Sequence, residues 1–394
     1  MARWDNWSGR HKSKPQSLHF IRSEEDACAL VQSAAANGQS IRVAGSGHSH
    51  SQLVPNDSIV VDSSGLSGVI DVDATSKTAW VWAGSKVYSL GRPLHDAGLA
   101  LKNQGDIDRQ AIAGACSTGT HGTGRQLQNL SASVKGFVLV TAAGELMTCD
   151  EHSHADVWQA ARLSLGAFGI LTRLKLQLTE SYKLRESGYS TAYNELVPKI
   201  PELIEAHERF EFFWYPKSDE ATVKIIDRTD EAAQYPLAEE GKRQAWNYEV
   251  LPSHRPHLHT EMEYSIPAED GVACFAKIRA LLHSDFPDIA WPVEYRTVAA
   301  DDVWLSMAYG RPTVTISVHQ DVREDETDYY RACEEIFLSY GGRPHWGKVN
   351  YLDGETLSAV HPKWSEWWQA RNSLDPKQVF LNAYLRALTS GMMA

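Results

Sequence analysis

The stretch Ile41-Arg42-Val43-Ala44-Gly45-Ser46-Gly47-His48-Ser49-His50-Ser51 decides which fold the chain can adopt. A short β-branched run passes into two glycines, a histidine and serines, which is typical of a strand that leads into a loop whose backbone lies against an anion. The dinucleotide fingerprint needs a third glycine that opens a helix, whereas this stretch continues through Gln52 to Pro55. We therefore expect a phosphate-bearing cofactor other than NAD.

A second glycine-rich stretch begins at Gly105 and ends at Gly124, and from Ala113 onward almost every residue in it is small. Few side chains there would keep a ligand away from the backbone, and the Ser and Thr hydroxyls offer further donors. Two glycine stretches that each carry a histidine predict a domain for a long, diphosphate-sized cofactor. The alternative is that both are tight turns of a β-rich domain.

The residues around these stretches alternate short strands and helices. Ser23 followed by three acids predicts a helix that Gly38 stops, and residues 169–178 alternate as a half-buried strand does. Further strands are expected at 58–62, 69–72 and 78–83, a hairpin at 134–140 with 145–148, and helices at 156–165 and at 86–97, which Pro93 would kink or restart.

The pattern of expected strands and helices changes from about residue 183. Strands are expected at 210–214, 222–226, 262–266 and 313–318, with helices at 269–282 and 328–340, whereas the polar residues 230–243 predict a surface segment. Strands and helices in this order are typical of an α+β domain.

Composition narrows the function classes. The 394 residues carry a net charge of -12 with no basic run, which argues against nucleic acid or an anionic membrane as the main partner. Five widely spaced cysteines without a C-x-x-C pair disfavour a disulfide framework or a zinc ribbon. The N-terminus lacks an apolar targeting region and no long apolar run follows, so we expect neither secretion nor insertion in a membrane. The cysteine pattern fits a reducing cytoplasm, and we expect a monomer.

Read together, the two glycine stretches resemble the PCMH-type FAD-binding domain of the vanillyl-alcohol oxidase superfamily. More narrowly, the chain resembles the sugar-1,4-lactone oxidases (gulonolactone, galactonolactone and arabinonolactone oxidases) and the alditol oxidases. His345-Trp346-Gly347-Lys348, Leu374-Asp375-Pro376 and Phe380 are similar to the C-terminal signature of that group. The resemblance implies an α+β fold of two domains: an FAD-binding domain at 1–182, a cap domain with a large antiparallel sheet at 183–355, and a C-terminal segment at 356–394 that returns to the FAD domain.

The resemblance also implies how the cofactor is held. By position, His48 would bond through a ring nitrogen to the 8α-methyl of FAD, although some relatives hold the flavin noncovalently. His50 is a rival for the bond, and we expect it to be a neighbour or a surface residue. Cys116 lacks the motif of a second covalent link and should be a buried, inert thiol. The other residues expected at the cofactor are Val43, Ala44, Gly45, Ser46, Gly47, Ser49, Gly105, Asp106, Gly114, Ser117, Thr118, Gly119, His121, Gly122, Gly169, Ile170, Asn382 and Tyr384.

Oxidation of a carbinol needs a hydride acceptor, a group that takes the hydroxyl proton, and a fixed cation. The resemblance points to Glu294 and Arg296, which lie two apart on one strand and so face the same side, and to His319 and Lys348 as active-site residues. Ordinary alternatives are a surface salt bridge for the first pair, a satisfied core histidine and a solvated lysine. Which group acts as the base stays open.

The expected activity is that of an FAD-dependent oxidase acting on a CH–OH donor. Hydride would pass from a carbinol of an aldono-1,4-lactone or related sugar alcohol to flavin N5, and O2 would reoxidise the flavin to give H2O2. Ala115 stands where the alditol oxidases carry a serine, which favours lactones over polyols. Alternatives are an alditol oxidase, or a dehydrogenase of the same fold that passes electrons to a quinone or a cytochrome.

A hydrolase with a metal site is a rival of a different class. His254, His257 and His259 with Glu261 could supply ligands, but Arg255 and Pro256 interrupt them and their spacing matches no zinc motif, so we expect a surface loop and no metal. A flavin-binding protein without turnover is a third possibility, against which the complete set of four catalytic candidates argues.

Overall fold

The first part of the chain forms a three-stranded and a five-stranded sheet, besides two two-stranded pairs, in this computed structural model, which describes residues 2–253 and 255–389. Strands β3 (Ser17–Phe20), β4 (Ile41–Ala44) and β5 (Ile59–Asp62) pair in parallel in the order β3-β5-β4. An antiparallel sheet has the order β10-β9-β11-β7-β6. Its strands are β6 (Val69–Asp73), β7 (Thr78–Trp82), β9 (Val134–Val140), β10 (Leu146–Asp150) and β11 (Ile170–Gln177).

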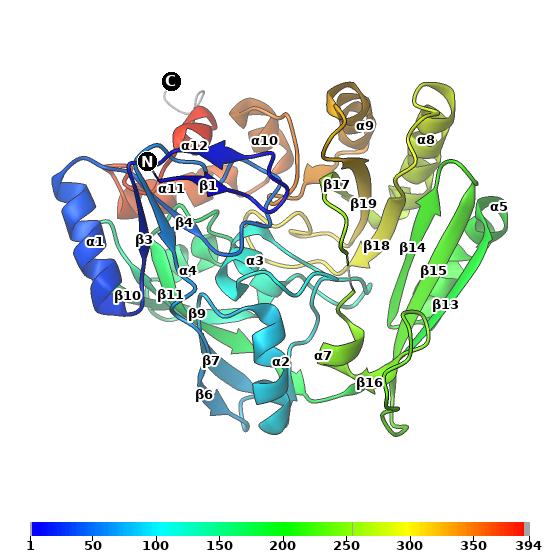
Figure 1. Cartoon of the computed structure of the whole chain (residues 1–394), viewed down its shortest axis with the longest axis horizontal. Helices are drawn as coiled ribbons and strands as arrows, with labels where there is room; N and C mark the ends of the chain where they lie inside the picture. The colour runs from blue at the N-terminus through cyan, green and yellow to red at the C-terminus, as the bar shows by residue number, and fades with distance from the viewer. Residues whose placement is uncertain (1, 254, 390–394) are drawn as a thin grey trace.

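Short helices connect and cover these sheets. They are α1 (Glu24–Ala36), α2 (Val87–Asp96), α3 (Ile112–Thr118) and α4 (Ala155–Ala161). Helix α3 lies at the centre of the molecule, between the small sheets and the larger sheet on the right of Figure 1. The second glycine stretch is therefore placed where the two halves of the fold meet.

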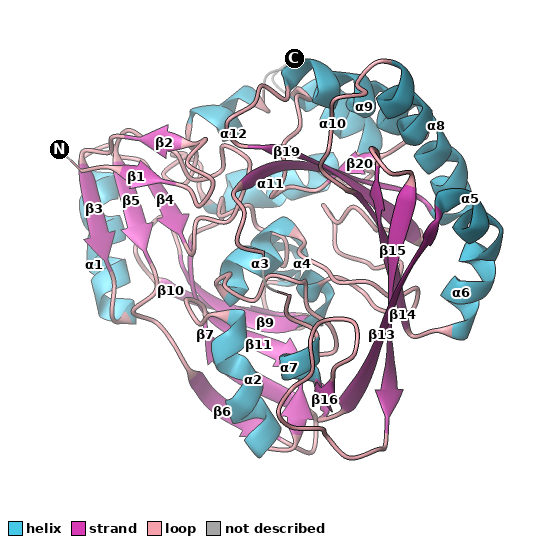
Figure 2. Ribbon diagram, turned by 45° about the vertical axis from the view of Figure 1, so that its right-hand side comes forward, coloured by secondary structure: helices cyan, strands magenta, loops and turns pink. Residues whose placement is uncertain are grey.

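The larger sheet has eight antiparallel strands in the order β16-β13-β15-β14-β18-β19-β17-β20. Helices α5 (Tyr193–Leu196), α6 (Ile200–Ala206), α8 (Gly271–Ser284) and α9 (Thr327–Ser339) lie on its outer side (Figure 2). The strands are β13 (Lys183–Ala192), β14 (Arg209–Tyr215), β15 (Glu220–Thr229), β16 (Gln244–Trp246), β17 (His259–Pro267), β18 (Val293–Val298), β19 (Thr313–Asp321) and β20 (Arg343–Pro344). A short helix, α7 (Asn247–Val250), follows β16.

The two faces of this sheet differ in chemistry because side chains alternate along each strand. Phe212, Tyr295 and Ile316 belong to the apolar core beneath the helices. Their chain neighbours Glu211, Glu294 and Ser317 belong to the opposite face, which we call the polar face. The helices therefore cover one face, and the other is free to line a site.

The end of the chain packs into the first core. Helices α10 (Gly354–Val360), α11 (Trp364–Leu374) and α12 (Ala383–Ala387) follow the last strand. Trp364, Trp367 and Trp368 belong to the same core as residues of β9 and β11. Val303 and Leu305, between β18 and β19, also pack there, so the chain returns to the first core from two places.

Most of the expected elements are confirmed, with informative differences. Helix α1 begins where predicted, with Ser23 Oγ accepting a bond from the amide of Asp26 at 3.1 Å. Helix α2 continues through Pro93 as one helix, and α4 is shorter than predicted. The second glycine stretch, expected to be a loop, contains α3, because its Ala, Cys and Ser residues are compatible with a helix until Gly119 ends it at φ +78°.

The predicted fold class is confirmed as α+β with a large antiparallel sheet. None of the described helices is long and apolar enough to cross a membrane. All five cysteines carry free thiols.

Candidate active site

The first glycine stretch leaves β4 and turns across the end of α3. A Cβ on Gly45 would lie 2.8 Å from Ala111 Cβ, and Gly47 has φ +66°, so both positions need glycine. The preceding Arg42 is buried and donates to the carbonyls of Leu53 and Phe380 at 2.6 Å each. This buried anchor holds the loop against the C-terminal part of the chain.

A narrow cavity lies between the two glycine stretches, and residues from both line it. Gly114 in α3 is informative because a Cβ there would meet no protein atom within 4 Å. Protein packing therefore does not require glycine at this helical position, whereas close approach of a ligand would. The cavity fits the expected FAD. Ten of the predicted cofactor residues line it: Val43, Gly45, Ser46, Gly47, His48, Ser49, Gly114, Ser117, Thr118 and Gly169.

The other predicted cofactor residues lie elsewhere. Gly105, Asp106 and His121 line a second, larger cavity. Outside the lining of both cavities are Ala44, Gly119, Gly122, Ile170 and Asn382. Tyr384 faces a separate hollow near the N-terminal residues.

Asn382 holds the residues that follow the first glycine stretch. Its side-chain amide donates to the carbonyls of Gln52 and Pro55 at 2.8 and 2.9 Å, while its oxygen caps α12 by accepting from the amide of Leu385. The C-terminal segment therefore holds the chain that follows His48 without reaching the cavity.

His48 is half-buried beside Trp7, with ring centroids 5.6 Å apart. Burial lowers the pKa of His48 to about 4, and the cations Lys348 and Lys86 act in the same direction. A neutral imidazole keeps a free lone pair, as a bond to carbon requires. His50, expected to be a neighbour or a surface residue, is a buried neighbour whose amide donates to the carbonyl of Gly347 at 2.7 Å.

Cys116 is buried, and burial raises the pKa of its thiol to about 12. This confirms the expectation of an inert thiol.

The larger cavity, of about 680 Å³, lies between the polar face of the sheet and the glycine stretches. It shares Gln110, Thr120, His345 and Lys348 with the narrow cavity, so the two adjoin. All four residues proposed from the resemblance to be catalytic line the larger cavity: Glu294, Arg296, His319 and Lys348. The fold thus brings together side chains that are far apart in the sequence.

Arg296 lies between two carboxylates. Its Nη2 is 2.7 Å from Glu263 Oε2 and 3.0 Å from Glu294 Oε2, and all three residues are buried. Burial alone would lower the pKa of Arg296, but the two carboxylates raise it. Arg296 is therefore a permanent cation, and the alternative of an exposed surface salt bridge is wrong.

Glu263 was not recognised from the sequence, although it connects the site. It accepts bonds at 2.7 Å from His121 Nε2, Arg296 and Ser317 Oγ. Burial would raise the pKa of Glu263, but His121 and Arg296 hold it well below the ordinary range. The alternation of Met262 and Tyr264 with Glu261 and Glu263 was the signal that could have placed both carboxylates on the polar face.

The pKa of Glu294 is shifted in the direction opposite to that of Glu263. Burial raises the pKa of Glu294 to about 8, and Glu211 and Asp106 add to the rise while Arg296 opposes it. The Glu294 carboxyl is therefore mostly protonated at neutral pH and presents an O–H donor beside the Arg296 guanidinium.

His319 is oriented by its two ring nitrogens. Nδ1 lies 2.8 Å from the carbonyl of Pro292, which can only accept, so the proton is on Nδ1 and Nε2 carries a lone pair. Nε2 is 3.7 Å from Glu261, and burial lowers the pKa of His319 to about 4. Burial would raise the pKa of Glu261, but Lys348 and His319 hold it well below the ordinary range, with Lys348 Nζ bonded to its carboxylate.

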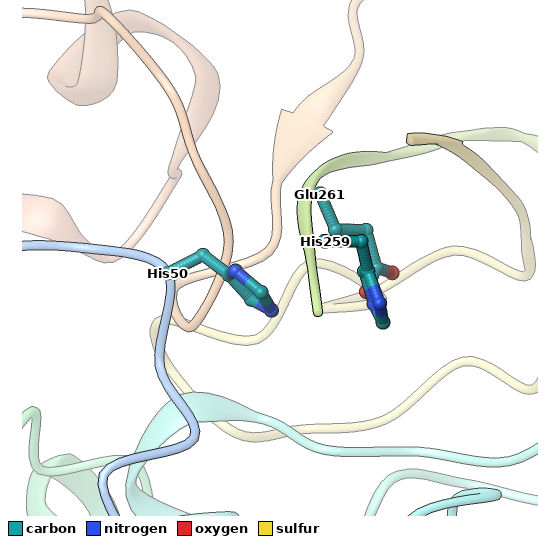
Figure 3. Close-up of side chains that lie close together, drawn as sticks. All are labelled: His50, His259 and Glu261. Atoms are coloured by element: carbon teal, nitrogen blue, oxygen red, sulfur yellow. The ribbon is translucent and has the colours of Figure 1, made fainter. Parts of the chain in front are cut away.

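Of the four residues of the rival metal cluster, the structure describes three. His254 lies outside the described residues, and His257 is exposed. His259 and Glu261 instead lie beside His50, with one candidate ligand atom of each residue within 4.8 Å of the others (Figure 3). The Lys348 ammonium already supplies a cation to Glu261 in this arrangement.

A network of ion pairs among residues other than the four catalytic candidates lines the larger cavity further along the sheet. Asp106 Oδ2 accepts from Arg255 at 2.8 Å, and Lys224 lies 3.0 Å from Glu211. Sequence reasoning assigned Asp106 to the cofactor loop, whereas the structure places it against cations of the sheet and its edge. Such partners come together only in the folded chain.

Two family models match this chain. The model described as D-arabinono-1,4-lactone oxidase matches residues 174–251 and 235–388, and the model described as an FAD binding domain matches residues 15–150. The chain is 34% identical to L-gulono-1,4-lactone dehydrogenase of Mycobacterium tuberculosis, over 97% of this chain and 98% of that protein. It is 26% identical to the L-gulonolactone oxidase of Bos taurus (98% and 97% covered) and 26% identical to the alditol oxidase of a Streptomyces species (98% and 99% covered).

Solved structures share the fold at low identity. Cholesterol oxidase from B. sterolicum superposes with a TM-score of 0.87 at 16% identity, covering 98% of this chain and 96% of that one. The 6-hydroxy-D-nicotine oxidase of Arthrobacter nicotinovorans gives a TM-score of 0.76 at 17% identity, with 95% and 93% covered. At these identities the likeness extends to the architecture alone.

Proposed function

The chain belongs to the D-arabinono-1,4-lactone oxidase family, and from this membership we propose that it oxidises a carbinol of an aldono-1,4-lactone or a related sugar alcohol. It is an FAD-dependent oxidoreductase of the class that acts on sugar lactones or alditols. The finer proposal is that His48 holds FAD covalently, that O2 is the electron acceptor and that H2O2 is released.

One observation carries the proposal. The polar face of the sheet presents a proton acceptor, a proton donor and a fixed cation to a cavity that adjoins the one between the glycine stretches. FAD, when bound, accepts the hydride that leaves the carbinol carbon. The residues of this chain then have to bind the sugar and move one proton.

We assign the proton to His319. Its Nε2 lone pair takes the carbinol proton, and Glu261, 3.7 Å away, stabilises the imidazolium that forms. Lys348 supplies positive charge beside Glu261 for a developing oxyanion. Glu294 and Arg296 bind sugar oxygens as donors, with Arg296 held by Glu263.

The division of labour along the chain is part of this proposal. Residues 1–182 would hold FAD, residues 183–355 would form the cap that supplies the substrate cavity, and residues 356–394 would complete the FAD domain. Support comes from the large sheet, whose strands begin with Lys183, and from the C-terminal helices that pack into the first core.

A dehydrogenase is a second candidate, because the 34% identical relative bears that name while other relatives are oxidases. Both candidates use the same site and differ only in the acceptor of the electrons. Reduction of an artificial acceptor in air without release of peroxide would therefore mark a dehydrogenase.

The test begins with the visible spectrum of purified protein before and after acid precipitation. We expect a yellow pellet for the wild type, loss of pellet colour in His48→Ala and retention in His50→Ala. Peroxide release on a panel of aldonolactones and alditols then tests the reaction, and dye reduction without peroxide would indicate a dehydrogenase. A wild-type protein that binds no flavin would contradict the proposal.

A further inference from the structure

The larger cavity continues far beyond the four residues that carry the proposed reaction. Going across the polar face from His319 on β19, the strands follow in the order β18, β14, β15 and β13, and the last residue on this path that lines the cavity is Ser190 on β13. With neighbouring strands about 4.8 Å apart, Ser190 lies roughly 19 Å across the sheet from His319. With carbon–carbon bonds of about 1.5 Å, an extended six-carbon chain spans only roughly 6–7 Å. A single lactone or alditol therefore leaves more than half of this path empty.

The far end of the cavity, which we call the outer pocket, has its own chemistry. Two hydroxyls, Ser190 Oγ and Thr222 Oγ1, lie 3.4 Å apart on adjacent strands. Tyr215, on β14, also lines this part of the cavity and leaves 38% of its surface exposed, although large aromatic side chains are usually covered. Gly188 and Lys242 complete the outer pocket.

The outer pocket has a fixed wall. Residues 230–243 were expected to be a surface segment, and most of them are, but Arg243 is buried and forms two bonds to the buried Glu186 at 2.6 and 2.8 Å. The amide of Gly241 also donates to Glu186, and that of Gly188 donates to the Gly241 carbonyl at 2.9 Å. A Cβ on Gly188 would lie 3.0 Å from Gly241 Cα, so glycine is needed for this close approach.

A wall that is held in one position indicates a cavity with a defined shape. Burying a charged pair is costly unless both partners are fully bonded, and here the Glu186–Arg243 pair pins residues 241–243 against β13. Without that pair, a polar segment would be free to move away from the sheet. The segment instead lines the cavity beside β13 with Gly241 and Lys242.

We propose that the outer pocket binds a second sugar ring, so that the preferred substrate is a lactone or alditol that carries a glycosyl group. A sugar ring combines hydroxyls at its edge with apolar C–H groups on its faces. The hydroxyls of Ser190 and Thr222 match the first, and the ring of Tyr215 matches the second. This inference rests on the proposed function, since the second ring is positioned by the oxidation of the first unit at His319.

The experiment compares the FAD-loaded enzyme on paired probes, D-glucitol with 4-O-α-glucosyl-D-glucitol and galactono-1,4-lactone with its 6-O-glycosylated counterpart. We expect kcat/KM to be at least tenfold higher for the glycosylated member of the pair that is oxidised. The decisive variant is Ser190→Trp, which fills the outer pocket. Its matched control is Ser187→Trp, on the same strand, also exposed but on the other face of the sheet and outside the cavity lining.

In Ser190→Trp the tenfold preference should disappear while turnover of the simple probe is unchanged, and in Ser187→Trp the preference should persist. Equal kcat/KM for both members of each pair, or a preference that survives in Ser190→Trp, would overturn the inference and leave the proposed function intact. Absence of turnover on every probe by flavin-loaded enzyme would instead count against the proposed function. Near-ultraviolet circular dichroism of both tryptophan variants checks that they are folded.

Discussion

At the scale of the residue, the protonation states of three side chains define what the site can do. His319 is a neutral acceptor, Glu294 a protonated donor and Arg296 a permanent cation, and each state follows from burial and from the neighbours of the group. Two carboxyl groups on one sheet thus have pKa values shifted in opposite directions. Both are paired with Arg296, but Glu263 also accepts from His121, whereas Glu294 lies near the carboxylates of Glu211, Asp106 and Glu261. Separate pKa values of this kind are typical of active sites.

Glu294 should make the activity dependent on pH. We expect kcat/KM to fall as the pH rises through about 8, where Glu294 loses its proton, and to fall at acid pH as His319 is protonated with a pKa of about 4. Glu294→Gln keeps a donor that does not titrate, so its alkaline fall should be absent. A pH profile of both enzymes on one substrate checks this, and an unchanged alkaline limb in the variant would refute the assignment.

The same group should affect stability with a defined sign. Because the pKa of Glu294 is about 8 in the folded protein and about 4.5 when unfolded, protonation favours the folded state. The wild type should therefore lose stability relative to Glu294→Gln as the pH rises from 4.5 to 8, by at most about 1.4 kcal/mol per unit of pKa difference. Urea unfolding of both apoproteins across this range is the measurement.

Glu263 should be essential for the folded site. Glu263→Gln leaves the buried Arg296 and His121 without their shared anion, and breaking such a pair costs about 3–5 kcal/mol. The exposed Glu269, near the end of the same strand, offers a control, and Glu269→Gln should change stability by less than about 0.5 kcal/mol. Equal midpoints of chemical denaturation for the two variants would show that Glu263 does not hold the site together.

At the scale of the element, the alternation of side chains was the part of the fold that the sequence predicted well. The strands at 210–214, 262–266 and 313–318 were placed from their patterns, whereas the shared face of Glu294 and Arg296 was expected from the family resemblance, which put them two apart on one strand. Helix α3 was missed because glycine and small residues also suit a loop, and which of the two forms depends on packing from distant residues. The Glu263–His121 contact joins residues 142 positions apart, a distance that no local pattern encodes.

Replacing Gly114 should have opposite effects on the stability of helix α3 and on the binding of the ligand. A helical glycine is less favourable than alanine by about 1 kcal/mol, so Gly114→Ala should stabilise the apoprotein by roughly that amount. The added methyl projects into the narrow cavity and should weaken binding of FAD. Thermal unfolding of the apoprotein and titration with FAD give the two readings.

Gly119→Ala provides the contrast, because its φ of +78° disfavours any side chain and its Cβ would meet Met307 at 2.9 Å. This variant should be less stable than the wild type with or without FAD. A Gly114→Ala protein that binds FAD normally would mean that no ligand approaches this face of α3.

At the scale of the whole molecule, the two halves of the fold are not independent. Residues of the stretch between β18 and β19, together with Trp346, pack into the core of the other half, and the glycine stretch is tied to the sheet through His121 and Glu263. The backbone amide of Gly124 adds a bond to the carbonyl of Thr297 at 2.8 Å. The site is therefore complete only in the full chain.

Expression of residues 183–353 alone should give a fragment without a fixed tertiary structure. Its buried Glu263 would lose His121, and Val303, Leu305 and Trp346 would be exposed. Near-ultraviolet circular dichroism and the cooperativity of thermal unfolding are the measurements. A fragment that unfolds in one sharp transition would contradict this view of the two halves.

The two-faced sheet has a consequence for how such a protein can change over generations. The helices pack against one set of alternating residues, and the other set lines the cavity. The chemistry of the cavity and the stability of the sheet therefore depend on different positions of the same strands. Substitutions at every second residue can therefore change the substrate preference without altering the packing of the sheet against the helices. An insertion of one residue within β17 would have the opposite effect, because it would turn its carboxylates toward the helices and erase both properties at once.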